Sequence, residues 1–114
     1  MRQKRVVELG EGMPFYCKLN LAYYKPPAVI EIKYQNELGG DILMFGSFSC
    51  DEPSNIKKDV ERNGRPTLIV VYPKNDPTSQ SFGDSDSFNM GFFGDETIEI
   101  RASFGIHNIN MNFC

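Results

Sequence analysis

The chain has 114 residues, of which 40% are hydrophobic and 24% charged, a size and composition typical of one soluble globular domain over residues 1–114. Its formal net charge is −3 and its basic residues are interspersed with acidic ones, which argues against a nucleic-acid partner. No apolar run is long enough to act as a signal peptide or to span a membrane.

Two early segments alternate apolar and polar residues. Residues 15–22 do so, and residues 29–34 repeat the pattern after two consecutive prolines. Alternation with a period of two places successive side chains on opposite faces of a strand, and consecutive prolines cannot continue a strand ladder. We therefore expect two half-buried strands, preceded by a short apolar-containing segment over residues 5–10.

The next segment, Asp41–Glu52, is apolar on both faces. It follows a Gly39-Gly40 turn. The side chains of Ile42, Met44 and Phe48 fall on one face, and those of Leu43 and Phe45 on the other. A strand with two apolar faces belongs inside a layered structure, so we expect this strand to lie at its centre.

Two alternatives remain open for residues 53–63. Ser54 is a suitable helix cap, Ile56 and Val60 are four residues apart, and Gly64 could end a short helix. The other alternative is a long irregular connection that crosses from one sheet to the other.

The second half of the chain predicts further strands. Residues 66–73 contain the continuous apolar run LIVVY, which predicts a second deeply buried strand. Residues 74–87 are polar and predict an exposed loop. Residues 88–93 and 97–104 then predict a hairpin around residues 94–96.

The tail over residues 106–113 alternates asparagine with apolar residues, and we expect an edge strand there. Natural edge strands are usually protected by lysine or proline. An unprotected edge either completes the domain's own sheet or pairs with a partner, and both alternatives are open. With the basic start of the chain and the loop over residues 74–87, this tail is the candidate contact surface. The candidate partner-binding residues are Asn108, Asn110, Asn112, Phe113, Arg2, Lys4 and Arg5.

Seven or eight short strands separated by turn signals predict an all-β fold, an antiparallel sandwich of jelly-roll type. At most one short helix is expected, around residues 54–63. Strands do not alternate with strong helices, which argues against an α/β fold.

No arrangement of residues predicts catalysis, so we expect a protein that is not an enzyme. His107 is the only histidine, and no serine lies in a G-x-S-x-G motif. Cys17, Cys50 and Cys114 form no C-x-x-C motif, so we expect neither a zinc site nor a disulfide framework, and no cofactor. This cysteine usage favours a reducing, cytoplasmic environment.

Acidic residues in two turns suggest calcium as an alternative. Asp84, Asp86, Asp95 and Glu96 could supply oxygen ligands from loops at one end of a sandwich. The helical calcium loop is excluded, because Phe88 and Asn89 stand where that motif needs a ligand and a glycine.

Residues 15–104 resemble the bacterial pre-peptidase C-terminal domain and related jelly-roll-like sandwiches. The pieces that carry the resemblance are VIEIKYQNELGGDILMFGSFSCDEPS, TLIVVYP and FNMGFFGDETIEIRASF. The resemblance implies a small non-catalytic sandwich used for binding or targeting, which in secreted members can carry calcium. Similar modules occur in intracellular proteins of protists, including ciliary ones. The second carboxylate of the family's Asp-x-Asp run is missing from Asp41–Phe45, which weakens the calcium alternative.

Together these observations predict a protein-interaction or structural module that binds other protein chains of a larger assembly. The expected location is the cytoplasm, including the cytoskeleton or a ciliary axoneme. The alternative is a sandwich that binds a ligand or a membrane surface in the presence of calcium.

Overall fold

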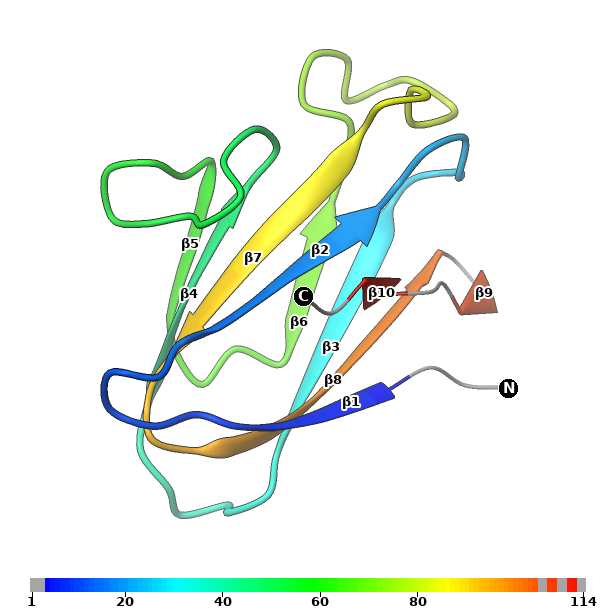
Figure 1. Ribbon diagram of the computed structural model, residues 1–114. Coiled ribbons are helices and arrows are strands. Elements are labelled where there is room, and N and C mark those ends of the chain that lie inside the picture. The colour runs from blue at the N-terminus through cyan, green and yellow to red at the C-terminus, as the bar shows by residue number, and fades with distance from the viewer. Residues whose placement is uncertain (1–3, 105–106, 109–110, 113–114) are drawn as a thin grey trace.

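The computed structural model describes residues 4–104, 107–108 and 111–112 (Figure 1). All of its regular elements are strands, and this part of the chain contains no helix. The strands are β1 (Lys4–Glu8), β2 (Phe15–Asn20), β3 (Ala28–Tyr34), β4 (Ile42–Ser47), β5 (Val60–Gly64), β6 (Leu68–Val71), β7 (Ser87–Phe93), β8 (Thr97–Phe104), β9 (His107–Asn108) and β10 (Met111–Asn112).

The strands form two antiparallel sheets. Sheet I has the order β1-β8-β3-β6, with β9 also paired to β8, and sheet II has the order β10-β2-β7-β4-β5. Most consecutive strands lie in opposite sheets, so the chain crosses repeatedly between the two layers (Figure 1). Apart from the two-residue strands β9 and β10, this is the strand order of a jelly roll. The predicted all-β antiparallel sandwich is therefore confirmed.

The core lies between the inward faces of the two sheets. Strand β8 alternates strictly, with Ile98, Ile100, Ala102 and Phe104 buried and the residues between them partly exposed. The inward residues of β2 and β3 pack into the same cluster, as the alternation of residues 15–22 and 29–34 predicts.

Strand β4 has buried side chains on both faces, as expected for the doubly apolar segment, although Leu43 on the outward face is only half-buried. It lies between β7 and β5, with Ile42 and Met44 in the core. On the opposite face Phe45 is only 5% exposed, because the ring of Phe93 lies 5.7 Å away and the Lys58 ammonium group 5.4 Å away.

Residues 53–63 match neither expected alternative. Residues 60–64 form β5, which pairs with β4 in the same sheet, so the connection between these strands does not cross the sandwich. The helix is absent because its intended apolar face has nothing to pack against: Ile56 is 85% exposed.

The expectation that residues 66–73 form a deeply buried strand is wrong. Strand β6 pairs only with β3 and lies at the edge of sheet I. Its inward residues Ile69 and Val71 are buried, whereas Leu68 and Val70 are exposed. The outward face of β6 is not covered by another layer, so only half of the apolar run enters the core.

The hairpin predicted around residues 94–96 is also wrong. Strand β7 already has β2 and β4 as neighbours, and β8 already has β1 and β3. Because both strands are paired on both sides, the short connection has to carry the chain from sheet II to sheet I (Figure 1).

The tail forms two short strands instead of one. Strand β9 pairs with the end of β8 in sheet I, and β10 pairs with Leu19 and Lys18 of β2 in sheet II. Of the two alternatives for this edge, the described backbone follows the first, pairing within the chain's own sheets. The predicted contact residues Arg2, Asn110 and Phe113 lie outside the described residues.

The packing at Gly46 gives a test of the core. A Cβ atom added to this residue of β4 would overlap the buried ring of Phe88. We expect Gly46→Ala to lower the free energy of unfolding by about 1–3 kcal/mol, measured by urea denaturation, because overpacking forces the ring to move. The control is Gly40→Ala, where an added Cβ meets no atom within 4 Å. A Gly46→Ala protein as stable as the wild type would contradict this packing.

Candidate interaction surface

The four acidic residues of the calcium alternative do not converge. Asp84 and Asp86 precede β7, whereas Asp95 and Glu96 follow it, so the two pairs lie at opposite ends of a strand roughly 20 Å long. A carboxylate oxygen of Asp86 accepts the N–H of Gly83 at 2.7 Å, which uses one of its oxygens locally. Within the described residues, no three potential metal-ligating side chains form a group.

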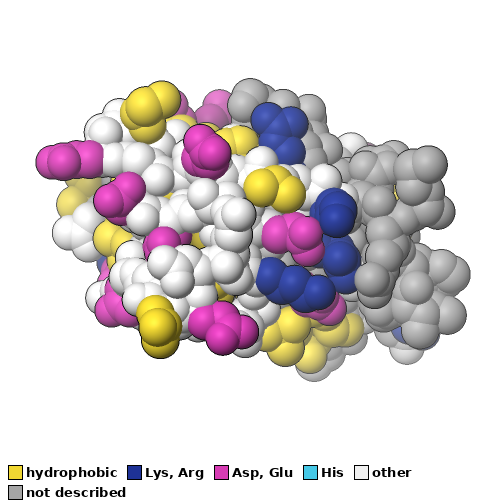
Figure 2. All heavy atoms as spheres, turned by 90° about the horizontal axis from the view of Figure 1, so that it is seen from below, with side chains coloured by type: hydrophobic (Ala, Val, Ile, Leu, Met, Phe, Trp, Pro, Cys, Tyr) yellow, Lys and Arg dark blue, Asp and Glu magenta, His cyan; other side chains and the backbone are white. Residues whose placement is uncertain are grey.

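The predicted basic contact residues that the structure describes lie on β1. Lys4 pairs with Glu99 at 3.5 Å, and the Arg5 guanidinium lies 5.9 Å from the centre of the Phe15 ring. Figure 2 shows the molecule from below the view of Figure 1, and on this side of the molecule basic side chains gather next to the residues that are not described. The backbones of Asn108 and Asn112 belong to β9 and β10.

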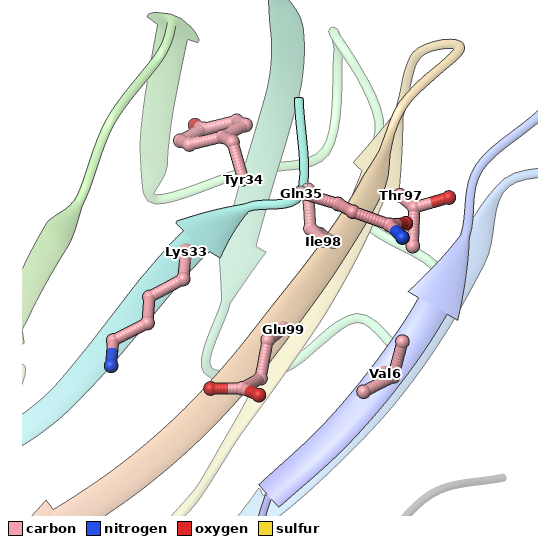
Figure 3. Close-up of a pocket in the computed structure, with 7 residues that line it drawn as sticks. All are labelled: Val6, Lys33, Tyr34, Gln35, Thr97, Ile98 and Glu99. Carbon is pink, nitrogen blue, oxygen red and sulfur yellow. The ribbon is translucent and has the colours of Figure 1, made fainter. Parts of the chain in front are cut away.

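The outward face of sheet I carries a connected set of charges at its centre. Arg101 lies 3.9 Å from Glu31 and 3.5 Å from Glu99, which also pairs with Lys4. Beside this set is a depression of about 320 Å³, where Val6, Glu99 and Lys33 come from three neighbouring strands (Figure 3). Most of these charges already compensate one another, so the centre of the face presents little unpaired charge.

Apolar side chains are exposed at the β6 edge of the same sheet. We call Leu68, Val70 and Tyr72 the β6 stripe; they are 54%, 42% and 50% exposed. They share one face because alternate residues of an extended strand point the same way. The stripe is apolar surface on a strand whose other face is fully buried.

The backbone of the stripe is also free to bind. The Thr67 carbonyl accepts the N–H of Ile32 at 3.0 Å, so Thr67 faces β3. Because backbone polar groups alternate in direction along a strand, the N–H and C=O groups of Leu68 and Val70 face away from β3. No described strand pairs with them on that side.

The other sheet edges in the described part of the chain are protected. Strand β1 carries Lys4 and Arg5, β5 carries Glu61 and Arg62, and β2 is partly covered by β10. Charges and covering strands are the usual protection of edges against pairing with other chains. Residues 66–73 contain no charge, and this edge is protected only by the shortness of β6 and by Pro66 and Pro73, each two residues beyond an end of the strand.

An arginine clamp fixes the start of β6. Arg65 donates to the carbonyl oxygens of Gly40 and Asn36, both at 2.6 Å, and pairs with Glu96 at 2.9 Å. These contacts join the connection before β6 to two other loops at the same end of the sandwich. Charge-assisted hydrogen bonds of this kind are among the stronger polar interactions in proteins.

Tyr34 completes this clamp. The Arg65 guanidinium stacks 4.2 Å from the centre of its ring, and its hydroxyl donates to the carbonyl of Pro66 at 2.7 Å. Burial raises the pKa of Tyr34 to about 12, although the charge of Arg65 opposes that rise. Pro66, two residues before β6, is thus held by a neutral hydroxyl.

An ion pair holds the chain after β6. Lys74 lies 2.7 Å from Asp59, whose other carboxylate oxygen accepts the N–H of Phe48 at 2.9 Å. The hydrogen bond from Lys74 and then that from Phe48 lower the pKa of Asp59. Both ends of β6 are therefore anchored, and its outward edge is held in an extended conformation.

A shallow groove of about 590 Å³ lies beside the start of the stripe. Its lining includes Leu68, Thr67 and the carboxylates Glu31 and Glu37, together with Lys33. Apolar surface therefore adjoins acidic side chains at this end of β6.

No family model, curated protein or solved structure matches this chain. The resemblance to the pre-peptidase C-terminal domain thus stays a prediction. No helix able to cross a membrane is present among the described residues.

Tyr34 offers a test of the clamp. Its folded pKa of about 12 lies above the ordinary value of 10, so the unfolded state loses this proton first. The contribution of Tyr34 to stability is complete below pH 10 and is lost as the pH rises toward 12. In an absorbance titration of the folded protein, we expect a late-ionising tyrosine that disappears in Tyr34→Phe but remains in the control Tyr23→Phe. An unchanged titration curve for Tyr34→Phe at high pH would contradict this geometry.

Proposed function

We propose that the chain is a non-enzymatic protein-interaction module that binds other protein chains through the β6 stripe. One observation carries this proposal: an anchored edge strand exposes three large apolar side chains and an unpaired row of backbone groups. Exposed apolar surface next to open hydrogen-bonding groups is the combination that strand-adding partners use.

The setting of the module is part of the same proposal. The uncharged stripe favours a protein surface over nucleic acid, which requires clustered positive charge. The resemblance to sandwiches of intracellular assemblies supports a subunit of a cytoplasmic complex, cytoskeletal or ciliary. The calcium-dependent alternative has less support, because Asp84 and Asp86 lie far from Asp95 and Glu96.

A stripe variant tests the proposal. Burying Leu and Tyr side chains contributes well over 1 kcal/mol each, so we expect Leu68→Ser combined with Tyr72→Ser to weaken partner binding at least about tenfold. Partners are captured from cells by proximity cross-linking, and each is then purified and titrated against the wild type and the variant.

The matched control is Val6→Ser, which removes an exposed apolar side chain from β1, at the opposite edge of sheet I. It should bind each partner as the wild type does. If purified partners bind the stripe variant with unchanged affinity, the stripe is not the docking surface.

A further inference from the structure

We propose that the β6 edge also pairs with the β6 edge of a second copy of this chain, which joins two copies of sheet I across a two-fold axis. This inference rests on the proposed function, because it uses the same stripe, and it names one partner for it. The occupant is a second copy because the hydrogen-bonding pattern and the side chains of this edge complement themselves, and no unpaired charge on the segment between Arg65 and Lys74 opposes the contact.

The backbone pattern sets the register. The outward polar groups of β6 belong to Leu68 and Val70. Tyr72 directly follows the strand, and the same alternation extended by one residue directs its backbone groups outward as well. In an antiparallel pair centred on Val70, Val70 faces its own copy and Leu68 faces Tyr72 of the second copy. Each of these pairs exchanges two hydrogen bonds. In this register every outward backbone N–H and C=O group of the stripe therefore has a hydrogen-bond partner on the second copy.

The side chains follow the same symmetry. Residues directly opposite in an antiparallel pair share one face of the sheet. The stripe would therefore continue across the axis, with Leu68 beside the ring of Tyr72 of the second copy. The prolines do not interrupt this ladder, because Pro66 precedes and Pro73 follows the three paired residues.

The charges favour an antiparallel approach. No charged residue lies between Arg65 and Lys74, and these two flanking cations are already paired with Glu96 and Asp59, so two chains of net charge −3 can meet here without unpaired like charges at the contact. In this register Lys74 of the second copy faces Pro66, at the end of β6 where Glu37 lines the groove, and the neighbouring Arg65 is already paired with Glu96. An antiparallel pair brings Lys74 of the second copy to this acidic end of β6, whereas a parallel pair in register places the two Lys74 residues side by side.

The size of the contact predicts a weak dimer. Stable interfaces bury about 800 Å² on each partner, and an edge pairing through one four-residue strand covers much less than that. We therefore expect a dissociation constant of the dimer between about 10 µM and 1 mM. With such an affinity, the local concentration of the chain in an assembly decides whether two copies pair.

Sedimentation velocity of the whole chain over that concentration range is the first measurement. We expect the wild type to shift toward the dimer. Val70→Pro removes an outward N–H without removing a bond to β3, and it should weaken association by about tenfold or more, because two symmetric hydrogen bonds are lost. Val70→Thr keeps that N–H and should still associate. A wild type that stays monomeric at about 1 mM would overturn the inference.

A cross-link tests the register without relying on the proline variant. Facing residues in a hydrogen-bonded pair have Cα atoms about 5.5 Å apart, which a disulfide can span. In a background of Cys50→Ser and Cys114→Ser, we expect Val70→Cys to form a disulfide-linked dimer on mild oxidation. The matched control, Glu61→Cys on the β5 edge, should not. Equal cross-linking by both variants would overturn the register.

The two proposals fail in different ways. If the wild type is monomeric but purified partners still lose affinity for the stripe variant, self-pairing is wrong and the proposed function stands. If Val70→Cys cross-links specifically but purified partners bind the stripe variant with unchanged affinity, self-pairing stands and the stripe is not the binding site for other proteins.

Discussion

The proposed binding surface depends on strand β6, which pairs with a described strand on one side only. Strand β6 contributes Ile69 and Val71 to the core, and their burial holds it firmly against β3. The same strand geometry forces Leu68, Val70 and their backbone groups to the outside. Because successive side chains of a strand point to opposite faces, the core buries half of this apolar run, and the other half is exposed because no other element covers the outward face of β6.

Anchoring turns this exposed half into a usable surface. Before β6, Arg65 stacks on Tyr34 and bonds the loop that contains Asn36. After β6, Lys74 forms an ion pair with Asp59. A binding segment that is already extended loses less conformational entropy when a partner adds a strand. The jelly roll thus supplies a rigid frame, and the interaction chemistry is concentrated at one of its edges.

The sequence predicts those parts of the fold that depend on local pattern. The alternation of residues 97–104 identifies a half-buried strand, and the doubly apolar segment around Met44 identifies an inner one. Strand pairing is different, because it depends on contacts between distant segments. The turn over residues 94–96 has the same composition whether its strands pair or cross between sheets, and the polar strand β5 has no apolar alternation to reveal it.

The candidate site shows the same limit. The run LIVVY predicts burial by composition, but Pro66 and Pro73 at its ends were a signal for an edge, where a missing N–H is tolerated. The clamp could not be predicted, because Arg65 reaches carbonyl groups 25 and 29 residues earlier in the chain. The separation of the four acidic residues likewise follows from the direction of β7 and not from their spacing in the sequence.

Amide hydrogen exchange at low protein concentration tests the central claim most directly. If β6 is an open edge, the amides of Ile69 and Val71 exchange slowly because they bond to β3, whereas those of Leu68 and Val70 exchange at nearly the rate of an unstructured peptide. Slow exchange of all four amides in the dilute monomer would mean that this edge is covered, and would contradict the account.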